Sequence, residues 1–238
     1  MRLDPSASIV VLTGAGVSAE SGVATFRDSG GLWERHRVED VATPEGFVRD
    51  PELVHRFYNA RRAQLAEVAP NAAHRALAEL EARWPGDFLL VTQNVDDLHE
   101  RAGSRKLLHL HGELRRIRCL RCGGVASWAG DTGVLTPCPV CGKPGGLRPH
   151  IVWFGEMPFE LDRIQEALAH CDAFLSIGTS GRVYPAAAFV EWTRPGALRM
   201  ALNLEPADNA VSFEEHRPGP AGDTVPALVA ELLEGLER

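Results

Sequence analysis

Long apolar stretches and lysine are scarce in this 238-residue chain, and acidic residues outnumber basic ones. No apolar run approaches the roughly 20 residues that a membrane-spanning helix needs. The run nearest the N-terminus follows Asp4 and Pro5 and does not have the pattern of a signal peptide. Only two lysines occur, Lys106 and Lys143, and the net charge is -7. These absences predict a cytoplasmic protein that binds neither nucleic acid nor membrane.

Cysteine is also sparse, yet four of the five cysteines form two CxxC pairs separated by fifteen residues. The pairs are Cys119 with Cys122 and Cys138 with Cys141. This spacing is typical of four thiolates around one zinc ion. Four thiolates leave zinc no open position for water, so the metal would be structural; the alternative is chance pairing of buried cysteines. Cys171 precedes an apolar run and is expected in the core.

Short apolar runs separated by helical patterns predict an α/β fold with a doubly wound parallel sheet. The expected strands are residues 9–12, 88–91, 106–110, 173–177 and 200–204. The expected helices are residues 71–84, 161–170, 184–193 and 225–236. Residues 30–83 and 113–148 interrupt this alternation. We therefore predict a large domain made of residues 1–29, 84–112 and 149–238, with the two insertions forming a smaller one.

Glycine or polar residues follow each expected strand, where ligands bind in open α/β sheets. After the first strand, Gly14-Ala15-Gly16 and Ala19 fit a dinucleotide fingerprint, in which glycines admit a pyrophosphate. A tight turn is the alternative. The acidic residue that normally reads the ribose is missing from the expected place, so we expect Asn203 and Glu205, after a later strand, to read it.

Two further strand ends carry groups suited to catalysis. His109 and His111 alternate along one expected strand and should face the same side. A histidine at a strand end can take up a proton near pH 7, but a satisfied core histidine is an equal alternative. Asn94 and Asp96 follow another strand, where their side chains can bind sugar hydroxyls or simply cap the next helix.

Residues 52–67 have helical periodicity, and the stretch FYNARR within them carries two adjacent arginines. At 100° per residue, Arg61 falls on the same apolar stripe as Tyr58, whereas Arg62 falls at its edge and should reach water. A guanidinium on an apolar stripe needs an anion. From the helix alone, an internal carboxylate is the favoured partner for Arg61, and a bound ligand is the alternative.

Taken in order, the motifs resemble those of the sirtuin family of NAD-dependent protein lysine deacylases, most closely its class III branch and the bacterial enzymes of that branch. The matching stretches span nearly the whole chain: GAGVSAESG, TFR at 25–27, TQNVDDLHERAG, LHGEL, both CxxC pairs, VWFGE, GTS at 178–180 and NLE at 203–205. The resemblance implies a Rossmann-like domain, a small zinc-ribbon and helical domain, NAD as co-substrate, and one structural zinc per chain.

The resemblance also implies roles for residues at the strand ends. His111 would be the general base on the nicotinamide ribose, with Asn94 and Asp96 holding that ribose and the nicotinamide pocket. The other cofactor contacts it implies are Gly14, Ala15, Gly16, Ser18, Phe26, Arg27, Trp33, Gln93, Gly178, Thr179, Ser180, Asn203, Glu205 and Ala221. Ala24 stands where most sirtuins have proline, which leaves the loop of Phe26 and Arg27 freer in φ.

The same resemblance gives Arg61 a ligand. In the class III branch a Tyr-x-x-Arg pair binds the carboxylate of succinyl or malonyl lysine, and Tyr58 with Arg61 matches it, while Ala42 matches the small residue that widens the pocket. Residues 152–155 (Val152, Trp153, Phe154 and Gly155) would pair with the substrate backbone. The expected partners are therefore proteins carrying succinyl-, malonyl- or acetyl-lysine. A plain deacetylase and a non-catalytic NAD-binding zinc-ribbon module remain alternatives.

Overall fold

The structure is a computed structural model that describes residues 3–23, 32–33 and 36–236. Its larger part is a parallel six-stranded sheet in the order β11-β10-β9-β1-β4-β5. The strands are β1 (Ile9–Thr13), β4 (Phe88–Thr92), β5 (Leu107–His109), β9 (Ala173–Ile177), β10 (Leu198–Asn203) and β11 (Glu215–Pro218). The five expected strands and the doubly wound α/β fold are confirmed, and β11 is an additional edge strand.

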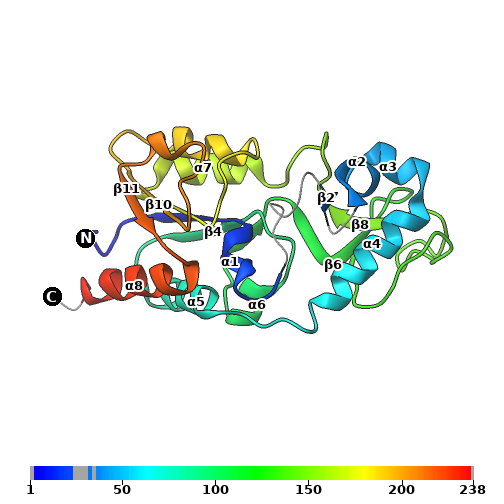
Figure 1. Ribbon diagram of the computed structural model, residues 1–238, viewed down its shortest axis with the longest axis horizontal. Helices are drawn as coiled ribbons and strands as arrows, with labels where there is room; N and C mark the ends of the chain where they lie inside the picture. Colours follow the sequence, from blue (N-terminus) through cyan, green and yellow to red (C-terminus); the bar gives the residue numbers. More distant parts are fainter. Residues whose placement is uncertain (1–2, 24–31, 34–35, 237–238) are drawn as a thin grey trace.

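Helices cover both faces of this sheet (Figure 1). Ile9 and Val11 of β1 pack with α5 (Ala72–Arg83) and α8 (Ala221–Glu234). Val10 and Leu12, which alternate with them, pack with α7 (Leu161–His170) and the 3-10 helix η1 (Ala186–Trp192). The helix expected over 184–193 is a shorter 3-10 helix, and the last helix begins at Ala221 rather than at residue 225. Among the described residues, no helix is long and apolar enough to cross a membrane.

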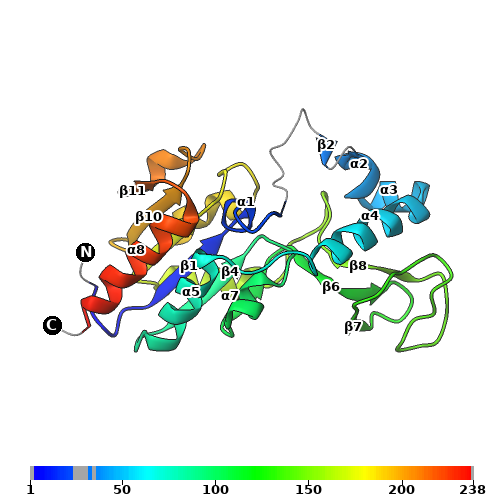
Figure 2. The same ribbon diagram turned by 60° about the horizontal axis from the view of Figure 1, so that its bottom comes forward.

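A smaller part lies at the opposite end of the molecule from the two termini (Figure 2). It contains an antiparallel sheet of β6 (Gly112–Cys119), β7 (Val125–Ser127) and β8 (Leu147–Ile151). The antiparallel pair of β2 (Leu32–Trp33) and β3 (His36–Arg37) precedes the helices α2 (Val38–Val41), α3 (Pro44–Arg49) and α4 (Pro51–Gln64). Helix α4 begins where Asp50 accepts a hydrogen bond from the Leu53 amide, with Pro51 in its first turn.

Helix α5 lies inside the predicted insertion 30–83, yet it packs with the large sheet. Ala73, Ala76, Leu77 and Leu80 share one apolar cluster with β1, β4 and α8. The change of packing partner therefore falls before α5, because its apolar face is needed to cover the sheet. Asn71 caps this helix and its side chain also donates to the Val17 carbonyl, which ties α5 to the turn after β1.

Candidate active site at the strand ends

Three glycines let two strand-end turns touch. The Gly16 amide donates to the Gly178 carbonyl at 2.9 Å. A Cβ on Gly14 would lie 2.7 Å from the Gly178 carbonyl oxygen, and a Cβ on Gly178 would lie 2.6 Å from the Val17 nitrogen. Gly178 also has φ +64, which disfavours other residues. These close approaches require glycine at the three positions and bring the ends of β1 and β9 to one edge together with α1 (Ala15–Ala19).

The side chains of Ser18, Asn94 and Asp96 form one buried hydrogen-bonded chain at this edge. The Asn94 Nδ2 donates to Ser18 Oγ and to the Gly14 carbonyl, each at 3.0 Å. Ser18 Oγ donates to Asp96 Oδ2 at 2.9 Å, and Asp96 Oδ1 accepts from the Leu98 amide at the start of α6 (Leu98–Ala102). Asp96 therefore accepts from the first amide of α6 and holds Ser18 at once. Its burial raises the pKa of the carboxyl group, while the hydrogen bonds oppose that rise.

His111 is placed as a neutral imidazole with one nitrogen committed. Its Nδ1 lies 3.2 Å from the Gln93 carbonyl oxygen, which can only accept, so Nδ1 carries the proton and Nε2 is the basic atom. Burial lowers the pKa of His111, and the hydrogen bond to Gln93 only partly offsets this. An imidazole of this kind can act as a base at neutral pH.

His109 differs from His111 in the partner of its second ring nitrogen and in the net direction of its pKa shift. The expectation that both alternate on one strand is wrong, because β5 ends at His109 and His111 lies in the turn that follows. The ring of His109 contacts the Asn94 carbonyl oxygen with Nδ1, at 3.3 Å, and Glu100 with Nε2, at 2.7 Å. Burial lowers the pKa of His109, but Glu100, Glu113 and the Asn94 carbonyl together raise it, so the net shift is upward and favours the cation.

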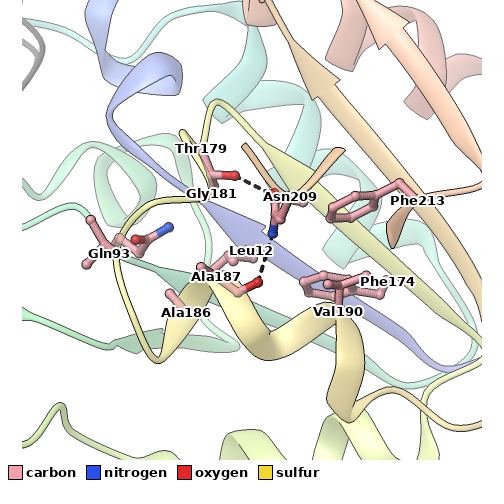
Figure 3. Close-up of a pocket in the computed structure, with 12 residues that line it drawn as sticks. Leu12, Gln93, Phe174, Thr179, Gly181, Ala186, Ala187, Val190, Asn209 and Phe213 are labelled. Carbon is pink, nitrogen blue, oxygen red and sulfur yellow. Dashed lines mark hydrogen bonds between the residues drawn. The ribbon is translucent and has the colours of Figure 1, made fainter. Parts of the chain in front are cut away.

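The residues expected to contact phosphate and adenosine lie along the remaining strand ends. The Asn203 Oδ1 accepts from the Thr179 amide at 2.9 Å, so β10 holds the turn after β9. Thr179 and Gln93 also line the small pocket behind this turn, drawn in Figure 3. The Ser180 carbonyl accepts from the Asp208 amide. Glu205 is exposed nearby, whereas Ala221 is buried in the core beneath the first turn of α8.

Some expected contacts fall on parts of the chain for which the structure gives no side-chain description. Phe26 and Arg27 lie outside the described residues. The backbone of Trp33 belongs to β2, and nothing further is described for its side chain.

The four paired cysteines converge at one end of the β6–β8 sheet. Their Sγ atoms all lie within 4.8 Å of one another, and the Cys119–Cys141 and Cys122–Cys138 distances are 4.0 and 3.8 Å. Tetrahedral zinc with Zn–S bonds of ~2.3 Å separates its sulfur ligands by about 3.8 Å, so the donor set and its spacing fit zinc. Cys171 is buried against α7 and β9, as expected of a core residue.

Tyr58, Ala42 and Trp153 meet in the apolar cluster of the smaller part. Tyr58 is fully buried, its hydroxyl oxygen accepts from Trp153 Nε1 at 2.9 Å, and burial raises the pKa of the phenol to about 12. Arg61 is only 6% exposed, and its guanidinium carbon lies 5.8 Å from the centroid of the Phe57 ring. The inward direction of Tyr58 and Arg61 predicted from the periodicity of α4 is therefore observed.

The outward direction predicted for Arg62 is wrong. Arg62 is only 2% exposed. Its Nε donates to the Leu114 carbonyl at 2.8 Å, and its Nη1 donates to Asn59 Oδ1 at 3.0 Å and to the Gly130 carbonyl at 3.2 Å. Periodicity placed this residue at the edge of the stripe, but β6 and the zinc-binding loop cover that edge. Arg62 therefore joins α4 to the ribbon.

Residues 152–155 connect the two groups of side chains. The Val152 amide donates to the His111 carbonyl at 2.9 Å, and the Phe154 amide donates to the Ala42 carbonyl at 3.0 Å. The Trp153 amide donates to Glu156 Oε2, whose carboxylate also pairs with the buried Arg148. This pair was missed from the sequence, although a glutamate directly after Gly155 and an arginine just before Pro149 were visible. Nothing local in the sequence shows that the two residues meet.

Known proteins match both the sequence and the fold. A family model described as "Sir2 family" matches residues 14–185. A Bdellovibrio bacteriovorus protein named NAD-dependent protein deacylase is 57% identical over 231 residues, which is 95% of this chain and 97% of that protein. An Escherichia coli protein of the same name is 56% identical over 232 residues, covering 96% of this chain and 83% of that protein.

Solved structures agree with these sequence matches. A mutant Sir2 homologue in complex with ADP-ribose has a TM-score of 0.89 and 40% identity, covering 97% of this chain and 93% of that one. A Sir2 homologue in complex with NAD has a TM-score of 0.87 and 40% identity, covering 96% of this chain and 90% of that one.

Proposed function

The chain belongs to the Sir2 family and is an NAD-dependent protein lysine deacylase; we propose that it removes succinyl and malonyl groups as well as acetyl groups. The observation that supports this acyl range is the buried pair of Tyr58 and Arg61 beside Ala42. When bound, NAD would supply the ribose carbon to which the acyl oxygen bonds, with nicotinamide as the leaving group. The residues of the chain position that ribose, move its proton and select the acyl group.

His111 is the proposed general base. Its Nε2 accepts a proton from a ribose hydroxyl, while Nδ1 stays bound to the Gln93 carbonyl and fixes the direction of the ring. Asn94 and Asp96 bind the ribose and line the nicotinamide pocket in this proposal. Hydrogen bonds to Ser18 keep both side chains in position. In the overall reaction one water would be consumed, the acyl group would end as an ester on ADP-ribose, and the lysine would leave as the free amine. Gly14–Gly16, Gly178–Ser180, Asn203 and Glu205 carry the rest of the cofactor in this proposal.

The acyl group is read at its far end. A succinyl or malonyl group ends in a carboxylate, which a guanidinium and a protonated phenol bind by charge-assisted hydrogen bonds. The phenol of Tyr58 remains protonated at neutral pH, because burial raises its pKa to about 12. An acetyl group lacks this carboxylate and gains nothing from the pair. Residues 152–155 pair with the backbone of the acyl-lysine peptide and run between His111 and Ala42.

The test compares turnover of succinyl- and acetyl-lysine peptides by the wild-type enzyme and by Arg61→Met. Loss of a charged hydrogen-bonding partner lowers kcat/KM for the succinyl peptide by about 10- to 100-fold and leaves deacetylation near its original rate. Arg56→Met is the control, because Arg56 lies exposed on the same helix. An equal fall in both activities contradicts the carboxylate-reading role and favours a plain deacetylase.

Nicotinamide release tests the alternative of a non-catalytic NAD-binding zinc-ribbon module. The deacylase releases nicotinamide only when NAD and an acyl peptide are both present. No release with any acyl peptide would favour the module.

A further inference from the structure

The hydrogen bond between Trp153 and Tyr58 joins the expected substrate-binding segment to the expected acyl reader. Trp153 follows β8, Tyr58 lies in α4, and both side chains are buried. The indole Nε1 lies 2.9 Å from the phenol oxygen. Since an indole N–H can only donate, the Tyr58 oxygen accepts in this bond and its own proton points away from Trp153.

Trp153 is itself held in place through both its ring and its backbone. The guanidinium carbon of Arg148 lies 3.3 Å from the ring centroid, and the Phe47 ring centroid lies 5.3 Å away. Arg148 binds both carboxylate oxygens of Glu156, at 2.6 and 2.9 Å. Glu156 also accepts from the Trp153 amide. The indole therefore cannot turn away from Tyr58 without breaking this packing.

We propose that Trp153 is a positioning residue for acyl selectivity, because its indole turns the Tyr58 hydroxyl so that the phenol donates to the distal carboxylate of a succinyl- or malonyl-lysine. This inference rests on the proposed carboxylate-reading role of Tyr58 and Arg61. Without the indole donor, the hydroxyl loses a bond that restricts its rotation, and the bond to the carboxylate must first overcome that freedom. An acetyl group makes no such bond.

The physical consequence is a change in substrate preference rather than in chemistry. The Tyr58 hydroxyl meets the end of the acyl group, far from the atoms that react at His111. Its contribution is therefore equal in the bound substrate and in the transition state, which alters KM more than kcat. The expected signature of losing the indole donor is a higher KM for the succinyl peptide.

The test is a double-mutant cycle with Trp153→Phe, Tyr58→Phe and the double variant, scored by the succinyl-to-acetyl ratio of kcat/KM. Trp153→Phe lowers this ratio by about fivefold, mainly through the KM of the succinyl peptide. In the Tyr58→Phe background it changes the ratio no further. Trp84→Phe is the matched control: Trp84 also donates a buried indole hydrogen bond, to the Ala7 carbonyl, but far from this cluster. It leaves the ratio unchanged.

Two outcomes of the cycle overturn the proposal. One is a ratio that Trp153→Phe leaves unchanged. The other is a fall in the ratio that persists when Tyr58 is already phenylalanine. If instead Tyr58→Phe and Arg61→Met both leave the ratio unchanged, the proposed acyl range itself fails, whatever Trp153→Phe does.

A second measurement needs no variant at Trp153. In a nitrogen-15 NMR spectrum of the zinc-loaded enzyme, one indole N–H resonance shifts in Tyr58→Phe and is thereby assigned to Trp153. That resonance moves further when the wild-type enzyme binds a succinyl peptide than when it binds an acetyl peptide. Equal shifts with the two peptides, or no indole resonance that responds to Tyr58→Phe, would contradict the proposal.

Discussion

The strand-end edge around His111 and the cluster around Tyr58 are built in opposite ways. At the edge, small residues and backbone groups determine the geometry. Gly14 and Gly178 allow two turns to touch, and the Gln93 carbonyl orients the ring of His111. In the cluster, large side chains bury one another, and Trp153 binds Tyr58 directly. In the proposed function, the edge contacts groups that every acyl substrate shares, whereas the cluster contacts only the acyl end. The two regions should therefore be separable by mutation.

Removing the zinc site has the largest expected effect, because it lowers the activity that depends on the edge and the activity that depends on the cluster. Structural zinc contributes about 10–16 kcal/mol of apparent binding free energy in small zinc domains, so the ribbon does not fold without it. Cys138→Ser lowers the melting temperature, and turnover of succinyl and acetyl peptides falls together. Metal analysis gives about one zinc per chain in the wild-type protein. A folded, zinc-free protein with an unchanged melting temperature would rule out the structural role.

Replacing the proposed base removes the catalytic function of the edge and leaves the Tyr58 cluster unchanged. His111→Ala lowers kcat/KM by about 100- to 10,000-fold for succinyl and acetyl peptides alike. The reason is that proton transfer at the ribose is common to both reactions. Binding of NAD, measured by calorimetry, remains detectable and shows that the fold is intact. Full activity in this variant, or a loss confined to one acyl group, would remove His111 from the role of base.

Arg61 and Arg62 are adjacent buried arginines on α4 with different expected roles. Arg61 is the proposed reader of the acyl carboxylate, whereas Arg62 is expected to contribute to stability. Arg62 donates to two carbonyls and one amide oxygen within the protein. Arg62→Met removes these three hydrogen bonds, one of them to the carbonyl of the buried Leu114, and lowers the free energy of unfolding by about 2–4 kcal/mol. Denaturant titration measures this loss, and the succinyl-to-acetyl ratio stays at the wild-type value. A changed ratio would mean that both arginines contact the acyl group.

The smallest expected effect is a fall in the free energy of unfolding in mild acid, caused by two buried histidines. His74 and His99 are buried with ring centroids 4.7 Å apart; burial lowers the pKa of His74 to about 4 and that of His99 well below its usual value. Both are neutral in the folded chain. Below the unfolded pKa of ~6.5 only the unfolded chain takes up these protons, so stability is complete above ~6.5 and falls as the pH drops toward 4.

Denaturant titrations at pH 7 and pH 5.5 measure this effect. The free energy of unfolding falls by about 2 kcal/mol from the two histidines together. His99→Gln, which keeps a polar group near Thr13, reduces the fall. A pH dependence that His99→Gln leaves unchanged would show that other groups cause it.

The sequence predicted the edge better than the cluster. Apolar runs locate buried strands, and parallel strands bring their ends together, so distant motifs such as residues 14–16 and 178–180 could be placed at one edge without coordinates. The sequence singled out His111 as the base, but the different protonation of His109 and His111 could not be predicted, because it depends on where β5 ends. Glu100 and the Gln93 carbonyl then give the two rings different protonation.

In the cluster, the sequence pattern predicted contacts only within one helix and not between elements. The periodicity of α4 turned Arg61 inward correctly and Arg62 outward incorrectly, because the cover over Arg62 comes from β6 and the loop at Gly130. The bond from Trp153 to Tyr58 joins residues 95 positions apart, and no spacing signals such a contact. Similarly, α5 looked like part of the insertion, and only its packing with α8 shows that it belongs with the large sheet.

The most direct test of this division uses the unmodified enzyme and two peptides that differ only at the acyl end. One carries succinyl-lysine, and the other carries the neutral carboxamide of the same length. If Arg61 and Tyr58 read the carboxylate, kcat/KM for the succinyl peptide exceeds that for the carboxamide peptide by about tenfold or more. Arg61→Met abolishes that difference. Equal turnover of the two peptides by the wild-type enzyme would contradict the account.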